Sequence, residues 1–525
     1  MDDARANDSG LYRPLSWAAA FGLTAGALML WRSFYCPEWI NLGLVCDRAF
    51  RITRGQTPYL DFFCPTTPLM YYSLALWFRL FGVSSLTSQV YAAAQCGLVV
   101  AITVYVCYVG LGFSKTRTAF MGALQSIWAP TMMLGSITYD GDASFYTLLT
   151  GLFLFAADRR PERKHLFAFL SGAAAGLAFW SKQDMGAGAV AGAGAAVFLL
   201  FVLPPQKGRP LLLPFAAGLG AVFGVAAVFF LLKGACRDML YWVFQRAVMV
   251  KWGAEKGPGG LSKFISPFTT TIDKSTKYVA LLYAVACASG WIKTLTGRGQ
   301  DDPALGAVCL VFLGAFYAAA LTHNGQGYTA GMSHFGIALA LLWRQVERAG
   351  KDFGRPRLIS FACFAFCGAI GLRGWHYLDN LPHYHGPWHT LTAERLRGMH
   401  VPSREGPAVD RLLSFIRERI PPQDSFLSFD LNMVPYFVND RLCPLPFTNH
   451  NPSEASRELD EEILIKAASK PEIRWLLSIG TPGSLGDRFY LRQMPGLLDY
   501  LLKNFEVKET LGGPPDRQLT VWTRR

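Results

Sequence analysis

Long apolar runs are the feature that most limits what this chain can fold into. Stretches of about 18 or more residues with almost no charge recur along it, and each is long enough to cross the hydrocarbon core of a bilayer. Of the 525 residues, 51% are hydrophobic and only 17% are charged, whereas a soluble globular protein carries about 25% charge. The sequence therefore predicts a mostly α-helical, polytopic membrane protein.

Hydropathy predicts a transmembrane bundle of about eleven spans. They are expected near residues 15–34, 86–110, 117–136, 143–157, 165–181, 187–204, 211–232, 277–293, 304–321, 331–347 and 356–374. The first run has no small-residue cleavage site after it, so it is expected to remain as an anchor. The apolar piece from Pro68 to Phe81 is short for a span and is expected to lie along the interface or to re-enter.

Basic residues cluster in the short gaps between the apolar runs. They are Arg159, Arg160, Arg163, Lys164, Lys207, Arg209, Arg344, Arg348, Lys351, Arg355 and Arg357. Cytoplasmic loops carry such an excess, so we expect a bacterial-type inner membrane with the N-terminus inside and the C-terminus outside. Contacts with membrane lipids account for the net charge of +13. No basic helix with interleaved stacking aromatics indicates a nucleic-acid partner.

The composition changes from about Trp375. "GPAVDRLLSFIRERIPPQDSFLSFD" predicts an amphipathic helix, a Pro-Pro break and a strand. Further helices are expected in "RELDEEILIKAASK" and "LRQMPGLLDYLLKNF", and strands in "IRWLLSIG" and "LTVWTRR". Alternating helices and strands predict a small α/β domain. The expected domains are thus a membrane module at 1–375, with a first outer loop at 35–85, and an extracytoplasmic α/β domain at 376–525.

The first outer loop carries the acids Glu38, Asp47 and Asp61. A carboxylate near a bilayer is costly to desolvate, so it either faces water or serves a function. In "RITRGQTPYLDFF", Gly55 is expected to end a helix that begins near Asn41, and Pro58 to stiffen the exit. This geometry would aim Asp61 toward the membrane. The alternative is an ordinary interfacial turn whose acid meets solvent or an arginine.

"RGQTPYLDFFCPTTPLMYYSLALWFRLFG" resembles the first outer loop of GT-C superfamily glycosyltransferases. The likeness is to the branch with protein O-mannosyltransferases and the lipid A aminoarabinose transferase. The fitting residues are Gly55, Tyr59, Asp61, Pro68, Leu69, Leu80, Phe81 and Gly82. "GLAFWSKQDMG" is similar to the family's apolar helix ending in a lysine, here Lys182, and "HNGQGYTAGMSHFGIALALL" to its polar turn before a late helix. The C-terminal piece resembles the family's outer α/β domain.

One departure from the family pattern concerns the base. The alignment places Asn41 where the family has an aspartate, and an amide cannot take a proton from the acceptor. Glu38 lies three residues earlier, on the same face if the stretch is helical, and Asp61 is the other candidate. The base has moved, the chemistry is altered, or the chain is a non-catalytic relative. We assign Glu38 as the base and give Asp61 the sugar or acceptor hydroxyls.

The resemblance implies transfer of a sugar from a polyprenyl-phosphate donor to a hydroxyl of a lipid, glycan or protein, with inversion. A carboxylate must deprotonate the acceptor, and cations must stabilise the charge on the leaving phosphate. Asn41 and Tyr59 are expected to contact substrate. No cofactor and no obligate metal are expected.

Cations and polar residues elsewhere complete the expected site. Lys182 is the first choice for the phosphate, although a solvated, snorkelling lysine is the plain alternative. Arg246 and Lys251 rank second, because their stretch could be an interfacial helix that meets only headgroups. His323 flanks a Gly-rich turn and is expected near the substrate.

Two aspartates follow the third apolar run. Asp142 is expected to cap the N-terminus of the next helix, which leaves Asp140 to line the cleft. The enzyme hypothesis thus predicts that Glu38 and Asp61 share a wet cleft with Lys182 in reach.

Two further functions compete with glycosyl transfer. A transporter or flippase would be expected to show repeats and charges at mid-bilayer, whereas this sequence shows no repeat and keeps its charges at helix ends. A non-catalytic glycan-binding relative is motivated by Asn41. Eleven cysteines show no metal-binding spacing. Those expected outside, where a disulfide is chemically possible, are Cys36, Cys46, Cys64, Cys236 and Cys443.

Overall fold

The computed structural model describes residues 8–35, 39–132, 137–202, 211–246, 303–321, 335–352, 365, 387–446, 459–487, 489–492 and 494–525. The chain forms two compact units. The helical unit comprises Met1–Arg32, Ala92–Phe229 and Pro258–Pro382. The mixed unit comprises Ser33–Tyr91, Phe230–Gly257 and His383–Arg525. The loop at 35–85 therefore belongs to the same unit as the C-terminal domain.

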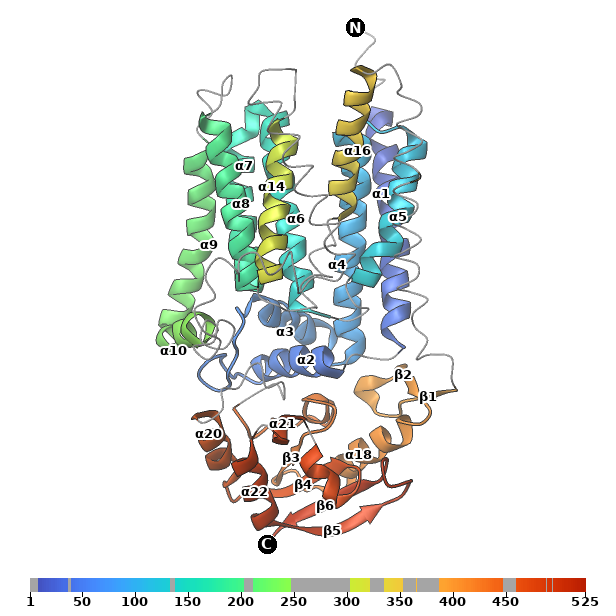
Figure 1. Ribbon diagram of the computed structural model, residues 1–525, viewed down its shortest axis with the longest axis vertical. Coiled ribbons are helices and arrows are strands. Elements are labelled where there is room, and N and C mark those ends of the chain that lie inside the picture. Colours follow the sequence, from blue (N-terminus) through green and yellow to red (C-terminus); the bar gives the residue numbers. More distant parts are fainter. Residues whose placement is uncertain are drawn as a thin grey trace. The chain divides into compact units, whose positions relative to one another are not determined.

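The long helices follow the apolar runs. They are α1 (Asp8–Ser33), α4 (Ser85–Tyr105) with the π-helical turn η1 (Val106–Gly110), α5 (Lys115–Met132), α6 (Tyr139–Arg159), η2 (Pro161–Arg163), α7 (Lys164–Ser181), α8 (Gln183–Val202), α9 (Leu212–Leu232), α14 (Pro303–Leu321) and α16 (Phe335–Asp352). In the helical unit, α6, α7, α8 and α14 pack side by side (Figure 1).

Membrane-spanning character is clearest in three of the described helices. Ser85–Gly110, Gln183–Leu200 and Leu212–Leu232 are long and apolar enough to cross a bilayer, and Leu69–Phe81 and Gly306–Ala315 are shorter apolar helices. Helices occupy the expected positions inside the described residues, and those near 277–293 and 356–374 lie outside them. The chain is thus a mostly helical membrane protein, and the count of about eleven spans stays a prediction.

Small residues let α8 and α14 approach closely. A Cβ on Gly188 would lie 2.2 Å from the carbonyl oxygen of Gly314, and a Cβ on Gly314 would lie 2.3 Å from that of Gly188. Lipid tails are as apolar as these helices, so no hydrophobic force drives the helices together. Close backbone contact of this kind stabilises their association instead.

We expect Gly188→Ala to destabilise the protein by about 1–3 kcal/mol, because the added methyl group would have to push two helix backbones apart. Gly194, on the same helix, is the matched control, since a Cβ there meets nothing within 4 Å. Gly194→Ala should be neutral or stabilise by up to about 1 kcal/mol through helix propensity. Thermal unfolding in detergent would measure both variants, and equal effects would contradict the packing argument.

The mixed unit begins with the helices of the first loop. They are α2 (Trp39–Thr53) and α3 (Leu69–Phe81), and after α9 come α10 (Cys236–Leu240) and the π-helical η3 (Tyr241–Arg246). The apolar piece that was too short for a span thus forms a separate helix, α3. It ends before Gly82, whose φ of +87° is a left-handed conformation that favours glycine.

The C-terminal part of the mixed unit is an α/β domain. Its elements are β1 (Trp388–Thr390), η8 (Glu394–Leu396), β2 (His400–Pro402), α18 (Gly406–Arg419), β3 (Ser425–Ser428), α19 (Val434–Val438), α20 (Leu459–Ala468), β4 (Ile473–Ile479), η9 (Pro482–Asp487), α21 (Phe489–Arg492), α22 (Pro495–Asn504), β5 (Phe505–Leu511) and β6 (Leu519–Arg524). The main sheet has the order β3-β4-β6-β5, and only β3 and β4 are parallel. β1 and β2 form a separate antiparallel pair.

The expected helices and strands of this domain are confirmed, with one correction. "LRQMPGLLDYLLKNF" was expected to be one helix, but α21 ends at Arg492 and α22 starts at Pro495. Proline lacks the N–H that a continuing helix needs, and it fits the first turn of a new one. α18 buries Leu412, Leu413 and Ile416 as its amphipathic pattern predicts.

Candidate active site

The turn after α2 has the shape that its sequence predicts. Gly55 follows the helix end with a φ of +86°, and no atom lies within 4 Å of a Cβ built there. Tyr59 also has a positive φ, +73°, which is unusual for a bulky residue and is a strain that proteins keep mainly at functional sites. We call residues 55–66 the motif turn.

Asp61 closes the motif turn through two hydrogen bonds to Thr57. Its Oδ2 accepts a hydrogen bond from the backbone N–H of Thr57 at 2.6 Å, and its own N–H donates to the Thr57 carbonyl at 3.0 Å. Asp61 therefore closes an ordinary turn through its two hydrogen bonds to Thr57, and its side chain is exposed, as the plain alternative expects.

Tyr59 and Arg48 belong to a buried polar network. The Tyr59 hydroxyl donates to the Thr66 carbonyl at 2.9 Å, and the Thr66 hydroxyl is 2.7 Å from that of Tyr71. Nη1 of Arg48 donates to the Tyr71 hydroxyl at 2.7 Å. Burial raises the pKa of Tyr59 well above its ordinary value, so this side chain is a neutral donor.

Sequence reasoning missed Arg48. It lies seven residues after Asn41 on α2, and both side chains are buried. That spacing places them on one face of the helix, so the periodicity of α2 was the signal that could have found it. Asn41, which stands where the family pattern has an aspartate, thus lies on the same face of α2 as the buried cation Arg48.

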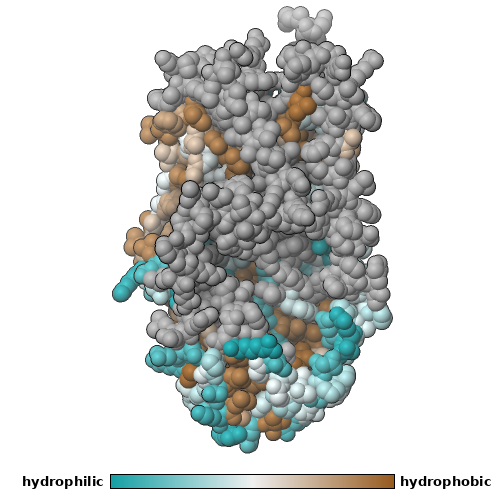
Figure 2. Space-filling model, viewed as in Figure 1, coloured by the Kyte–Doolittle hydropathy of each residue, from teal (hydrophilic) through white to brown (hydrophobic). Residues whose placement is uncertain are grey.

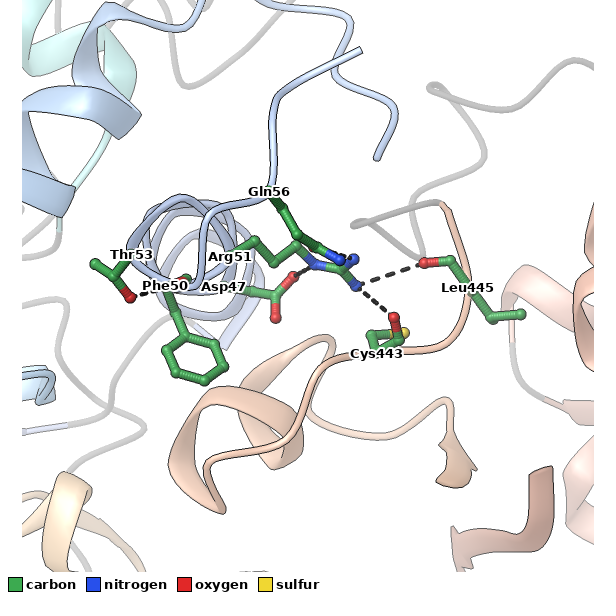
Figure 3. Close-up of polar contacts among 7 residues, drawn as sticks. All are labelled: Asp47, Phe50, Arg51, Thr53, Gln56, Cys443 and Leu445. Atoms are coloured by element: carbon green, nitrogen blue, oxygen red, sulfur yellow. Dashed lines mark hydrogen bonds and ion pairs between the residues drawn. The ribbon is translucent and has the colours of Figure 1, made fainter. Parts of the chain in front are cut away.

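Arg51 connects α2 with the C-terminal domain. Its Nε donates to Asp47 Oδ2 at 2.7 Å, and its Nη2 donates to the carbonyls of Cys443 at 3.0 Å and Leu445 at 3.4 Å (Figure 3). Nη1 reaches Gln56 in the motif turn at 3.3 Å. Burial acts to lower the pKa of Arg51, but the neighbouring Asp47 carboxylate outweighs it and leaves that pKa raised. Arg51 is therefore permanently charged, and its hydrogen bonds join α2, the motif turn and the C-terminal domain.

Asp142 does not cap α6, contrary to the prediction. The helix begins at Tyr139, and the hydroxyl of Thr138 accepts from the Gly141 N–H at 3.2 Å as the N-cap. The buried Asp142 lies in the first turn and accepts a hydrogen bond from Gln95 on α4. A local preference for an acid at the cap was thus overruled by a partner on another helix.

Lys182 is the single residue between α7 and α8, in an extended conformation with φ −154° and ψ 113°. Its Nζ lies 2.5 Å from Asp140 Oδ1 and 3.6 Å from Asp184 Oδ2. The side chain is 1% exposed, which excludes the solvated, snorkelling alternative. Within the described part of the chain, Oδ2 of the equally buried Asp140 has no hydrogen-bond partner.

This ionic cluster (Asp140, Asp184 and Lys182) was only partly predicted. Asp184 was missed, although it lies two residues after Lys182. Two carboxylates face one ammonium group, and the helices beside them are mostly apolar. Among the described residues, no group of three or more His, Cys, Asp or Glu side chains could hold a metal ion.

Of the remaining predicted site residues, the structure describes only Arg246. Arg246 is buried, with its guanidinium carbon 5.1 Å from the centre of the Trp242 ring. Glu38, Lys251 and His323 lie outside the described residues. Asp61 belongs to the mixed unit, whereas Lys182 belongs to the helical unit. A cleft shared by Glu38, Asp61 and Lys182 therefore stays a prediction.

The buried thiols of the mixed unit should resist alkylation. Cys46 and Cys443 are free and buried, and burial raises the pKa of Cys46 to about 12 and that of Cys443 to about 11. Since only the thiolate reacts, a maleimide at pH 7 should label the partly exposed Cys236 before Cys46 and Cys443. Mass spectrometry of native and denatured samples would measure this order, and early labelling of Cys443 would contradict it.

Comparisons with known proteins complete the description. No family model and no curated protein match the sequence. The oligosaccharyltransferase of Archaeoglobus fulgidus, solved with a tethered acceptor peptide, is similar at 12% identity with a TM-score of 0.47, over 96% of this chain and 73% of that one. ArnT from Cupriavidus metallidurans in the apo state is similar at 12% identity with a TM-score of 0.47, over 97% and 98%.

A second ArnT structure, bound to undecaprenyl phosphate, is similar at 10% identity with a TM-score of 0.40. The oligosaccharyltransferase and ArnT are GT-C superfamily membrane glycosyltransferases, the superfamily whose first outer loop this sequence resembles. With identities of 10–12% and TM-scores below 0.5, these likenesses assign neither a ligand nor a reaction to this chain.

Proposed function

We propose that the chain is a membrane glycosyltransferase that moves a sugar from a polyprenyl-phosphate donor to a hydroxyl acceptor at the outer face of the membrane, with inversion. The observation that carries this proposal is the ion pair of Lys182 and Asp140, whose side chains are each 1% exposed at the ends of apolar helices. Membrane proteins keep buried ionisable groups at the cost of stability, mostly where they serve chemistry or transport. The GT-C-like motif turn indicates which chemistry.

The roles follow from what each group can donate or accept. Glu38, directly before α2, is assigned as the base that takes the acceptor proton, because Asn41 cannot. Asp61, which is exposed, binds acceptor or sugar hydroxyls. Lys182 has three N–H donors, of which Asp140 takes one and Asp184 faces a second, and the third serves the donor phosphate. Arg246 and Lys251 supply further positive charge.

The structure adds Asp140 to the candidate bases. Its Oδ1 is held by Lys182, while Oδ2 has no partner among the described residues. A carboxylate with one oxygen held by a cation and the other without a hydrogen bond keeps a lone pair for the acceptor proton. It is a second candidate beside Glu38, and the two are separable by substitution.

Purified chain in nanodiscs would be incubated with a panel of radiolabelled polyprenyl-phosphate sugars, and release of free lipid phosphate would be measured. We expect Glu38→Gln and Asp61→Asn to lower the rate at least about tenfold, since positioned acid-base groups contribute about 10²–10⁴-fold. Exposed Glu405→Gln is the control. Wild-type chain that scrambles the lipid across the bilayer without releasing phosphate would refute the transferase and favour a flippase.

If Asp140→Asn abolishes release while Glu38→Gln does not, the base is Asp140. Activity that survives all three substitutions would show that these carboxylates are not catalytic. Size-exclusion chromatography of each variant would show that it is folded before its rate is compared.

A further inference from the structure

A small cleft lies in the C-terminal domain, between η8, α18 and the end of α19. Its volume is about 210 Å³, below the roughly 300–1,000 Å³ of pockets that hold drug-sized ligands. The apolar part of its lining consists of Ala393, Leu413 and Val438, of which Ala393 and Leu413 are buried. The cleft therefore has room for one small ring, and part of its lining is apolar.

The polar part of the lining is balanced in charge. It consists of Glu394, Arg395, Ser414, Arg417, Asn439 and Asp440. An anion in the cleft would meet two carboxylates, and a cation would meet two guanidinium groups. A neutral ligand with several hydroxyls would find both donors and acceptors, since guanidinium groups donate and carboxylates accept. Figure 2 shows hydrophilic side chains on the face where Figure 1 draws β1, β2 and α18.

Asp440 offers the cleft a charged acceptor. Burial acts to raise the pKa of Asp440, but the hydrogen bonds and charges of Arg54 and Arg395 outweigh it and leave that pKa lowered. Both arginines donate to Oδ1, Arg395 through Nη2 at 2.7 Å. Neither donates to Oδ2, so this oxygen is able to accept from a ligand hydroxyl.

Arg417 and Asn439 supply a donor and a neutral acceptor. Nη2 of Arg417 donates to Glu418 Oε1 at 2.7 Å, in an exposed pair, so the other N–H groups of the guanidinium are able to turn to a ligand. Nδ2 of Asn439 donates to the Pro435 carbonyl at 3.0 Å, which leaves the amide oxygen as an acceptor. A pyranose ring, with C–H groups on its faces and hydroxyls around its edge, matches such a lining.

The cleft is connected to the motif turn. Arg54, which pairs with Asp440, directly precedes Gly55. The guanidinium carbons of Arg54 and Arg395 lie 5.3 Å and 5.5 Å from the centre of the Phe50 ring on α2. A ligand that binds Asp440 therefore contacts a group that also holds the start of the motif turn.

We propose that this cleft binds one neutral sugar ring of an acceptor glycan, a ring other than the one that reacts. Asp440 and Asn439 accept from its hydroxyls and Arg417 donates to them, while its C–H groups pack on Leu413 and Val438. The acceptor role rests on the proposed function and makes the acceptor a glycan. Binding of the sugar ring itself does not depend on that function.

Sugar binding is measured without any lipid donor. The full chain in nanodiscs would be mixed with methyl α-D-glucopyranoside, methyl α-D-mannopyranoside, methyl α-D-galactopyranoside or N-acetylglucosamine, and saturation-transfer-difference NMR would detect the bound sugar. We expect at least one of the four to bind, and Arg417→Met to weaken that binding at least about fivefold. The matched control is Arg419→Met on the same helix, since Arg419 pairs with Glu509 at 3.3 Å and does not line the cleft.

A second variant tests the volume of the cleft. Ser414→Met would fill the space with an uncharged side chain, so it should abolish sugar binding. Binding of none of the four sugars, equal binding by Arg417→Met and the wild type, or tighter binding of glucuronate or of the zwitterion alanyl-alanine would overturn the proposal. If the Ser414 variant fails to fold, Arg417→Met still decides, because Arg417 is 57% exposed.

Amide hydrogen exchange tests the connection with the motif turn. The N–H groups of Gly55 and Gln56 donate to the Ile52 and Arg51 carbonyls at 3.1 Å and 3.0 Å, and a bound sugar should slow their exchange. Binding without this slowing would overturn the acceptor role. If a sugar binds and slows exchange, yet no polyprenyl-phosphate donor releases its lipid phosphate, the proposed function fails while the sugar site stands.

Discussion

Replacing Lys182 with methionine should destabilise the protein by about 3–5 kcal/mol, the cost of breaking a buried ion pair by removing one partner. The change keeps the length of the side chain but leaves Asp140 and Asp184 without their cation. Both acids are mostly buried, at 1% and 9% exposure, so water cannot replace the ammonium group. Thermal or denaturant unfolding in detergent would measure the loss.

A double-mutant cycle isolates the pair from the loss of packing. Asp140→Asn combined with Lys182→Met should be more stable than Lys182→Met alone, because the orphaned carboxylate is gone. Lys115→Met is the control, since Lys115 is exposed at the start of α5 and should cost less than about 0.5 kcal/mol. Equal losses for Lys182→Met and Lys115→Met would show that the pair is not buried as described.

The same cycle bears on function. A buried ion pair is weak support for stability, and an apolar replacement of both partners is often neutral. If the Asp140→Asn, Lys182→Met protein is stable yet releases no lipid phosphate, the charges were kept for the reaction. If it is stable and fully active, the pair serves neither the phosphate nor the acceptor.

Local rules predicted those parts of the fold that depend on neighbours in sequence. The apolar runs became helices, because the hydrocarbon core demands internal backbone hydrogen bonds whatever the tertiary contacts. Gly55 ended α2 because glycine adopts a left-handed φ without strain. Pro495, by contrast, divided a helix that had been read as continuous, although its missing N–H was visible in the sequence.

Contacts between distant segments were not predictable. Asp142 and Gln95 are 47 residues apart, and Arg51 and Cys443 are 392 apart. No periodicity within one segment reveals such partners, so the local pattern predicts a cap at Asp142 and gives no partner for Arg51. The burial of Lys182 was missed for the same reason, because a lysine at a helix end is normally solvated.

Arg51→Met is the second change expected to have a large effect. It leaves the buried Asp47 carboxylate without its cation, and the carbonyls of Cys443 and Leu445 without a donor. Removing one partner of a buried pair costs about 3–5 kcal/mol, and each orphaned polar group adds about 1–3. Arg51→Lys should recover only part of this loss, because one ammonium cannot reproduce the planar fork of a guanidinium.

Arg54→Met is the matched control three residues later. Arg54 also reaches the C-terminal domain, but its pair with Asp440 is about half exposed, at 47% and 49%. Exposed pairs contribute about 0–1 kcal/mol, so this variant should unfold almost as the wild type does. A loss equal to that of Arg51→Met would contradict the distinction between the two arginines.

Amide hydrogen exchange would separate a general loss of stability from a specific loosening of the motif turn. The Phe63 N–H donates to the Pro446 carbonyl at 2.8 Å, and the Gln56 N–H donates to the Arg51 carbonyl at 3.0 Å. If Arg51 positions the turn, Arg51→Met should speed amide exchange within residues 56–63 and at Cys443 and Leu445 well below the unfolding temperature, while β4 and β6 stay protected. Uniformly faster exchange would instead mean that Arg51 only stabilises the domain. In the specific case, the C-terminal domain is part of the machinery that shapes the motif turn.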